Sequence, residues 1–209
     1  MTMQERVAGI IAALKNAYPD AVCALEYKKD YELMISVRLS AQCTDARVNM
    51  VTPALFERFP TLDAFAQADV LEVENYVRTC GFYHHKARDI VLACQMLISD
   101  FGSKVPDNME DLLKLPGVGR KTANLLLGDI YHQPAVVCDT HCIRITNKLG
   151  LAAGKDPAKV EQQLWNVLPP EESSDFCHRI VLHGRAVCTA RAPKCSQCTL
   201  APYCKSFTG

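Results

Sequence analysis

The sequence predicts an all-α fold. Apolar residues recur at spacings of three and four through most of the 209 residues, as they do on the buried face of a helix. Thr and Asp residues precede several of these segments, in positions where they can cap a first helical turn. We find no convincing alternation of apolar and polar residues, no internal repeat and no low-complexity tract. Helix after helix with short links favours an all-α protein.

The first predicted helices lie before residue 60. The earliest has one apolar face, made by Val7, Ile10, Ile11 and Leu14. It ends before Pro19, which cannot continue a helix. Residues 31–39 contain β-branched residues that would suit a strand, but their helical neighbours favour a buried helix. Thr44 or Asp45 is expected to cap the next helix, which runs to about residue 59.

The later helices follow the same signals. Thr61 and Asp69 are expected to cap two short helices, the second of which ends at Gly81. Residues 86–101 are amphipathic, and Asp107 is expected to cap a short helix after them. Beyond residue 139 the pattern predicts three more helices, one running to Leu149-Gly150, one over 157–168 and one over about 175–187.

A glycine-rich turn separates two of these helices. Leu115-Pro-Gly-Val-Gly-Arg-Lys121 lies between apolar-periodic segments, so it predicts a tight hairpin rather than a helix interior. Glycine permits positive φ and lets another backbone approach without a Cβ in the way. The second helix begins at this turn, so its unpaired N–H groups and positive dipole end suit an anion such as phosphate.

Composition sets limits on the class of protein. Hydrophobic residues make up 49% and charged residues 22%, which is ordinary for a globular protein with one large or two small domains. No apolar run approaches about 18 residues and no secretory signal is evident, so we expect neither a secreted nor a membrane-spanning protein. Eleven cysteines without such a signal indicate reduced thiols in a cytosol, some of them metal ligands.

Charge is unevenly distributed although the formal net charge is zero. Residues 1–110 carry 11 basic and 15 acidic side chains, whereas residues 185–209 carry four basic and none acidic. Residues 111–150, around the predicted hairpin, carry five basic and three acidic side chains. Positive charge therefore gathers at two places where a nucleic-acid backbone could lie, although a solvated basic face would give similar counts.

The hairpin, Lys121 and Asp139 together resemble the helix-hairpin-helix, Gly/Pro-rich loop and Asp superfamily of base-excision DNA glycosylases. With the C-terminal cysteines, the motifs are similar to those of the endonuclease III family and run from about Leu39 to Cys204. The resemblance implies two lobes: a six-helix barrel over 23–133 that holds the hairpin, and an iron–sulfur lobe made of 1–22 and 134–209. It also implies a cytoplasmic, nucleoid-associated protein of bacterial or archaeal type.

The same resemblance implies catalytic roles for Lys121 and Asp139. A lysine amine can attack C1′ of a damaged nucleotide, expel the base and form a Schiff base that allows strand cleavage by β-elimination. A carboxylate near the sugar would stabilise the positive charge that develops as the base leaves. Two plainer interpretations stay open: Lys121 as a solvated or phosphate-contacting lysine, and Asp139 as a helix N-cap, which is compatible with catalysis.

The residues expected to contact DNA are Gln42, Phe82, Gly117, Gly119, Arg120, His141, Arg191 and Lys194. The resemblance implies that Gln42 and Phe82 fill the gap left when a nucleotide rotates out of the duplex. The family usually has Leu at the second position, so Phe82 departs from its pattern. The alternatives are a helix-end polar residue at Gln42, a core aromatic at Phe82 and a structural histidine at His141.

Four cysteines near the C-terminus have ligand spacing. Cys188, Cys195, Cys198 and Cys204 include only one CxxC pair, which fits paired-CxxC zinc sites poorly and a single cubane cluster well. The spacing matches the [4Fe–4S] pattern of the endonuclease III family, with zinc or disulfides as alternatives. The other seven cysteines lack ligand spacing, and most are expected to be small buried hydrophobes.

The leading hypothesis is therefore a monomeric, bifunctional DNA glycosylase and AP lyase that acts on oxidised pyrimidines or abasic sites in double-stranded DNA. A mismatch or pyrimidine-dimer glycosylase of the same superfamily is the second enzyme hypothesis. A non-catalytic DNA-binding iron–sulfur protein is the third hypothesis.

Overall fold

The computed structural model describes residues 1–207 and confirms the all-α prediction: within that range every regular element is a helix. The chain forms two compact units. One is Ala24–Tyr131, and the other combines Met1–Cys23 with His132–Gly209. These bounds differ from the expected ones at 23 and 133 by one and two residues.

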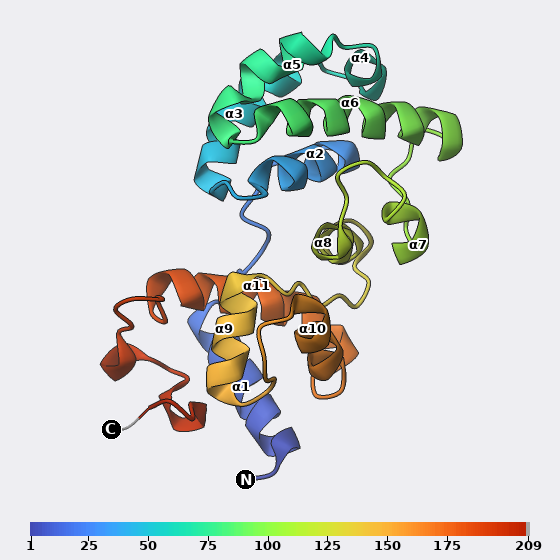
Figure 1. Cartoon of the computed structure of the whole chain (residues 1–209). Coiled ribbons are helices and arrows are strands. Elements are labelled where there is room, and N and C mark those ends of the chain that lie inside the picture. Colours follow the sequence, from blue (N-terminus) through green and yellow to red (C-terminus); the bar gives the residue numbers. More distant parts are fainter. Residues whose placement is uncertain (208–209) are drawn as a thin grey trace. The chain divides into compact units, whose positions relative to one another are not determined.

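The unit Ala24–Tyr131 holds seven α-helices and one 3₁₀ turn. They are α2 (Asp30–Ser40), α3 (Asp45–Arg58), α4 (Leu62–Ala66), α5 (Val70–Val77), η1 (Arg78–Cys80), α6 (Tyr83–Asp100), α7 (Met109–Leu112) and α8 (Arg120–Tyr131). Helix α6 lies between α4 and α5 on one side and α2 on the other, as Figure 1 shows. Helix α2 also contacts α3 and α8, so it is the element that joins the hairpin pair to the rest of this unit.

Burial explains why α2 is a helix despite its β-branched residues. Every residue from Glu32 to Val37 is buried, together with Leu39, so this helix is covered on nearly all sides. A helix buried all round shows no clear amphipathic stripe, and for this reason periodicity alone left a strand possible.

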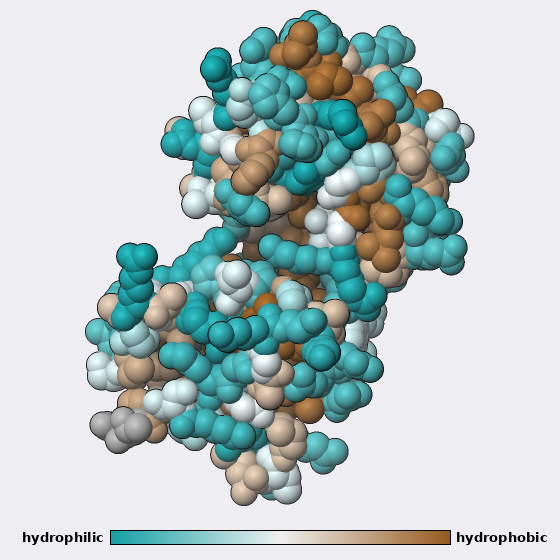
Figure 2. Space-filling model, viewed as in Figure 1, coloured by the Kyte–Doolittle hydropathy of each residue, from teal (hydrophilic) through white to brown (hydrophobic). Residues whose placement is uncertain are grey.

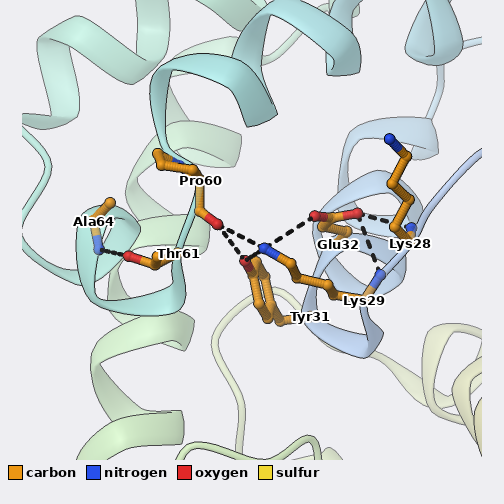
Figure 3. A network of polar contacts seen from close by, with 7 residues as sticks. All are labelled: Lys28, Lys29, Tyr31, Glu32, Pro60, Thr61 and Ala64. Carbon is orange, nitrogen blue, oxygen red and sulfur yellow. Dashed lines mark hydrogen bonds and ion pairs between the residues drawn. The ribbon is translucent and has the colours of Figure 1, made fainter.

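A polar network fixes the start of α2 against the link between α3 and α4 (Figure 3). The Glu32 carboxylate accepts hydrogen bonds from the backbone N–H of Lys28 at 2.8 Å and of Lys29 at 3.3 Å. The Lys29 ammonium and the Tyr31 hydroxyl both donate to the carbonyl of Pro60, at 2.7 and 3.2 Å. Two backbone amides just before α2 and a carbonyl just after α3 are thereby satisfied by one cluster of side chains.

The other unit contains α1 (Met3–Ala17), α9 (Thr140–Leu149), α10 (Pro157–Trp165), η2 (Pro170–Glu172), α11 (Ser173–Ala186), η3 (Cys195–Gln197) and η4 (Ala201–Tyr203). Helices α1 and α9 both pack against α11. The Arg6 guanidinium donates to the carbonyls of Leu149, at 3.1 Å, and Tyr203, at 2.8 Å. Arg6 therefore ties the end of α9 to the C-terminal segment.

Most predicted caps are present, including Thr44, Thr61, Asp69 and Asp139. The prediction for Asp107 was wrong, because Asn108 caps α7: its side-chain oxygen accepts from the N–H of Asp111 at 2.9 Å. Asn and Asp cap helices equally well, but Asn108 is the one that lies three residues before Asp111, whose amide has no partner within the helix itself. Helix α10 ends at Trp165, three residues earlier than expected.

Surface hydropathy differs from place to place. Figure 2 shows apolar side chains exposed on the unit Ala24–Tyr131. The large exposed hydrophobic residues of this unit are Met50, Leu71, Phe82, Leu92 and Leu113. Within residues 1–207, no helix has the length and apolar character needed to cross a membrane.

Candidate active site and cysteine pocket

The predicted glycine turn is present between α7 and α8. Gly117 has φ +76°, the left-handed conformation that favours glycine, and the N–H of Val118 closes the turn on the carbonyl of Leu115 at 3.1 Å. A Cβ on Gly117 would lie 2.5 Å from Arg38 Nε and 2.8 Å from Asp89 Oδ2. Gly117 is thus required twice, by its backbone angle and by its close packing.

An ion pair forms the surface on which Gly117 rests. Arg38 of α2 donates from Nε and Nη2 to one oxygen of Asp89 on α6, at 2.9 and 2.7 Å. Both side chains are about four-fifths buried, with 19% and 21% of their surface exposed. The pair joins two helices directly beneath the turn, so it holds the hairpin in place.

The start of α8 is open to solvent. Gly119 has no atom within 4 Å of the position that a Cβ would occupy, and Arg120 and Lys121 are exposed on the first turn. The opposite face of α8 is buried at Ala123 and Leu126. The Lys121 amine is consequently presented outward beside an open turn, where a ligand backbone could approach closely.

Gln42 and Phe82 occupy two loops of the same unit. Both are exposed, and both have left-handed backbones, with φ 53° and 46°. Phe82 is 64% exposed, so the interpretation of Phe82 as a core aromatic is wrong. Non-glycine residues rarely hold such angles without support from their surroundings.

The support comes from Lys86, which sequence analysis did not identify as a site residue. Its side chain is buried, and its ammonium donates to the carbonyls of Leu39, at 2.8 Å, and Cys80, at 2.6 Å. Burial is the main cause that lowers the pKa of Lys86. These two carbonyls precede Gln42 and Phe82 by three and two residues, so one buried lysine anchors both loops.

Asp139 caps α9 in the other unit. One carboxylate oxygen accepts from the N–H of Cys142 at 2.7 Å, and the other lies 3.1 Å from His141 Nδ1. The ring of His141 packs so closely on Gly184 that a Cβ there would be 2.5 Å from His141 Cδ2. The cap interpretation of Asp139 is correct, and the second oxygen keeps acceptor capacity for further chemistry.

The four spaced cysteines line a single hollow. It measures about 360 Å³, part of it open solvent, and Lys148 and Lys194 also line it. Arg144 donates to the carbonyl of Cys188 and lies 3.5 Å from its sulfur. His183 Nε2 is 3.4 Å from the sulfur of Cys198, and the N–H of Lys194 bonds the carbonyl of Val187 at 2.9 Å to close the loop.

These four thiols stand around a common space rather than meeting at one point. Burial raises the pKa of Cys198, and the nearby Cys188, Cys204 and Cys195 raise it further, as expected for four thiols around a common space. Within residues 1–207, no three His, Cys, Asp or Glu side chains converge closely enough to hold a metal ion. In a cubane cluster each thiolate binds a different iron, so the sulfurs stand apart around the group.

The predicted site residues therefore fall into two sets. Gln42, Phe82, Gly117, Gly119, Arg120 and Lys121 belong to the unit Ala24–Tyr131. Asp139, His141, the four cysteines, Arg191 and Lys194 belong to the other unit, and both Arg191 and Lys194 are exposed.

Comparison with known proteins decides the family. Residues 35–170 match the model of the HhH-GPD superfamily of base excision DNA repair proteins. Endonuclease III of Synechocystis sp. is 44% identical and aligns with 97% of this chain and 93% of its own length. For endonuclease III of Escherichia coli these values are 37%, 94% and 93%.

The chain belongs to the endonuclease III family.

Solved structures agree with this assignment. A trapped covalent intermediate of endonuclease III with DNA, in an estranged-adenine complex, superposes with a TM-score of 0.92 at 39% identity, covering 98% of this chain and 96% of that one. A thermostable thymine-DNA glycosylase shares the fold alone, with a TM-score of 0.82 at 19% identity. The expected two-lobed glycosylase fold is thereby confirmed, and endonuclease III family membership makes the chain a base-excision DNA glycosylase and AP lyase.

Gly117 and Gly119 give a matched pair of variants for this hairpin. We expect Gly117→Ala to lower the free energy of unfolding by at least about 1–2 kcal/mol, because an L-residue is strained in the left-handed region. Displacement of the Arg38–Asp89 pair adds to that loss. Gly119→Ala should cost less than about 1 kcal/mol, since its Cβ meets open space and only a helix-end preference changes.

Chemical denaturation of the two full-length variants measures the difference. Equal stability of Gly117→Ala and Gly119→Ala would contradict the packing argument.

Proposed function

We propose that this chain removes oxidised pyrimidines from duplex DNA and then cleaves the strand 3′ to the abasic site, with Lys121 as the nucleophile. The observation that carries the proposal is the exposed Lys121 on the first turn of α8, beside the open backbone of Gly119. The relatives support it, because solved structures of endonuclease III include a covalent intermediate with DNA.

The chemistry follows from a neutral amine. The Lys121 nitrogen attacks C1′ while the base departs with the electron pair of the glycosidic bond and gains a proton. Loss of a proton from nitrogen and opening of the sugar give a protonated imine. The imine acidifies the C2′ hydrogen, and removal of that proton expels the 3′ phosphate by β-elimination.

Asp139 would stabilise positive charge on the sugar as the base departs. One of its oxygens is committed to the cap of α9, and the other contacts His141. A carboxylate held at both oxygens has little freedom to rotate. We infer that the cap orients Asp139 and that catalysis uses its charge.

Gln42 and Phe82 would fill the duplex where the damaged nucleotide leaves the stack. Their exposure and the common anchor at Lys86 suit residues that must enter DNA without collapsing onto the protein. A flat Phe ring can stack on a neighbouring base pair, where an aliphatic residue would only wedge.

The four cysteines would hold a [4Fe–4S] cluster. When bound, it supplies structural cross-linking of the C-terminal segment, because hydrolysis and β-elimination require no electron transfer. The chain's own part is to present Arg191 and Lys194 from the loop between Cys188 and Cys195, where phosphates would meet them.

The decisive experiment is borohydride trapping on abasic duplex DNA. We expect the wild-type chain to form a covalent complex and Lys121→Gln to form none, because reduction captures only an imine. Lys104→Gln, an exposed lysine of the same unit, is the matched control and should trap normally. DNA binding without trapping by the wild type would overturn the lyase proposal.

A panel of single-lesion duplexes identifies the base. Faster turnover on oxidised pyrimidines than on G·T mismatches or pyrimidine dimers is expected. The opposite order would favour the second enzyme hypothesis.

Asp139→Asn separates charge from capping. Asn caps helices as well as Asp, so stability should change by less than about 0.5 kcal/mol. Turnover should fall at least about 100-fold, the typical cost of losing one electrostatic stabiliser, with DNA affinity nearly unchanged. Asp156→Asn, the same change at the cap of α10, is the control and should leave turnover intact. Equal losses of affinity and turnover in Asp139→Asn would favour a purely structural role.

Metal content tests the cluster. We expect about four irons and four inorganic sulfides per purified chain, with visible absorbance, and loss of both in Cys198→Ser. Stoichiometric zinc in a colourless protein would refute the cluster assignment.

Salt dependence tests the basic loop. Replacing Arg191 and Lys194 with Ala should reduce the log–log slope of DNA affinity against salt by about 0.9 for each phosphate that the loop no longer neutralises. A double Ala variant of Lys155 and Lys159, exposed in the same unit, is the control with an unchanged slope. An unchanged slope in the first variant would exclude an interaction between this loop and DNA.

A further inference from the structure

Two cysteines outside the C-terminal set lie next to the residues expected to enter DNA. Cys43 directly follows Gln42, and Cys80 ends η1, two residues before Phe82. Helix α3, which starts two residues after Cys43, packs against η1. The N–H of Cys43 bonds the carbonyl of Ser40 at 3.0 Å, and Lys86 joins the neighbouring carbonyl of Leu39 to that of Cys80, so the two segments that carry these cysteines lie side by side. Cys43 is also the side-chain hydrogen-bond partner of the Cys80 thiol.

The surroundings of this pair differ from those of an inert buried thiol. Cys43 is partly exposed, whereas Cys80 is buried. The positive charges of Lys86 and Arg47 act to lower the pKa of Cys80, and Cys43 acts to raise the pKa of Lys86. Partial exposure beside cationic side chains is typical of cysteines that react with oxidants.

Burial is the main cause that raises the pKa of Cys80 to about 11, with the neighbouring Cys43 adding to it. Cys80 is therefore a protonated thiol at neutral pH. The more accessible Cys43 is the sulfur that an oxidant reaches first.

Four of the five remaining cysteines are buried and offer useful contrasts. Cys94 is buried, and burial raises its pKa to about 12. Cys142 interacts with both Cys138 and Cys177, but all three are buried. Cys43 and Cys80 differ from these four buried thiols, because they interact with each other and Cys43 is also open to solvent.

We propose that Cys43 and Cys80 form a reversible disulfide when the protein meets a peroxide, and that this bond lowers its action on damaged DNA. The Cys43 thiolate attacks one peroxide oxygen and expels hydroxide, which leaves a sulfenic acid. The Cys80 sulfur then attacks Cys43 sulfur and releases water. Two thiols and one hydrogen peroxide thus give one disulfide and two waters.

The disulfide would act on the two exposed loops, because Cys43 directly follows Gln42 and Cys80 lies two residues before Phe82. Its formation draws the sulfurs from contact to about 2.05 Å and fixes the torsion between them. The pull on the two loops would displace Gln42 and Phe82 from the positions in which Lys86 holds them. Formation of the disulfide does not depend on the proposed function, but its effect on repair rests on that function.

Peptide mapping tests the bond itself. The full-length protein is treated with equimolar hydrogen peroxide, its free thiols are alkylated, and it is digested with trypsin without reduction. Cleavage after Arg38, Arg47, Arg78 and Lys86 isolates Cys43 in peptide 39–47 and Cys80 in peptide 79–86. We expect these two peptides linked, and separated again by dithiothreitol. Cys43→Ser should abolish the link and Cys94→Ser should keep it. Absence of the linked pair in oxidised wild type would overturn the proposal.

Turnover on abasic duplex DNA tests the consequence. Oxidised wild type should lose activity about tenfold or more, in line with the cost of small misplacements at a site, and dithiothreitol should restore it. Cys43→Ser should resist the same treatment, which separates this effect from oxidation elsewhere. A linked peptide with unchanged turnover would overturn the inhibitory role. Inactivity of the reduced wild type would instead overturn the proposed function, with the mapping still deciding the bond.

Discussion

The ion pair between Arg38 and Asp89 determines where the hairpin can lie. A guanidinium and a carboxylate four-fifths buried between α2 and α6 are costly unless each satisfies the other. Gly117 packs its bare backbone on this pair, and its left-handed φ then sets the direction in which α8 starts. The exposure of Lys121 one turn later is a consequence of that packing, so the proposed chemistry depends on a charge pair that lies beneath the turn.

Lys86 likewise fixes the two loops that carry Gln42 and Phe82 by means of a buried charge. A buried ammonium is tolerated only with hydrogen-bond partners, and the carbonyls at the ends of α2 and η1 are the groups that lack them. One side chain thus satisfies two helix ends and holds Gln42 and Phe82 in backbone conformations that they would not choose alone. Strain at these positions is maintained by the burial of Lys86, which holds the two exposed side chains where we propose that they enter a duplex.

Local signals explain how far the sequence alone could go. Caps, the glycine turn and the spacing from Cys188 to Cys204 each depend on residues a few positions apart, and most were predictable for that reason. Arg38 and Asp89 are separated by 51 residues, and Lys86 and Leu39 by 47, so no local pattern relates them. Asp107 and Asn108 are adjacent and both residue types cap well, so only the geometry of the first turn shows that Asn108 is the cap of α7.

The position of Asp139 shows why capping and catalysis can share one residue. A helix N-terminus needs an acceptor oxygen, and a departing base needs a nearby negative charge, so one carboxylate can meet both requirements. The N–H of Cys142 binds one oxygen and His141 contacts the other, while the His141 ring is held against Gly184. This preorganisation comes from ordinary helix packing within one unit. Asn at this position would keep the geometry and lose the charge, and it is charge rather than shape that the reacting sugar would sense.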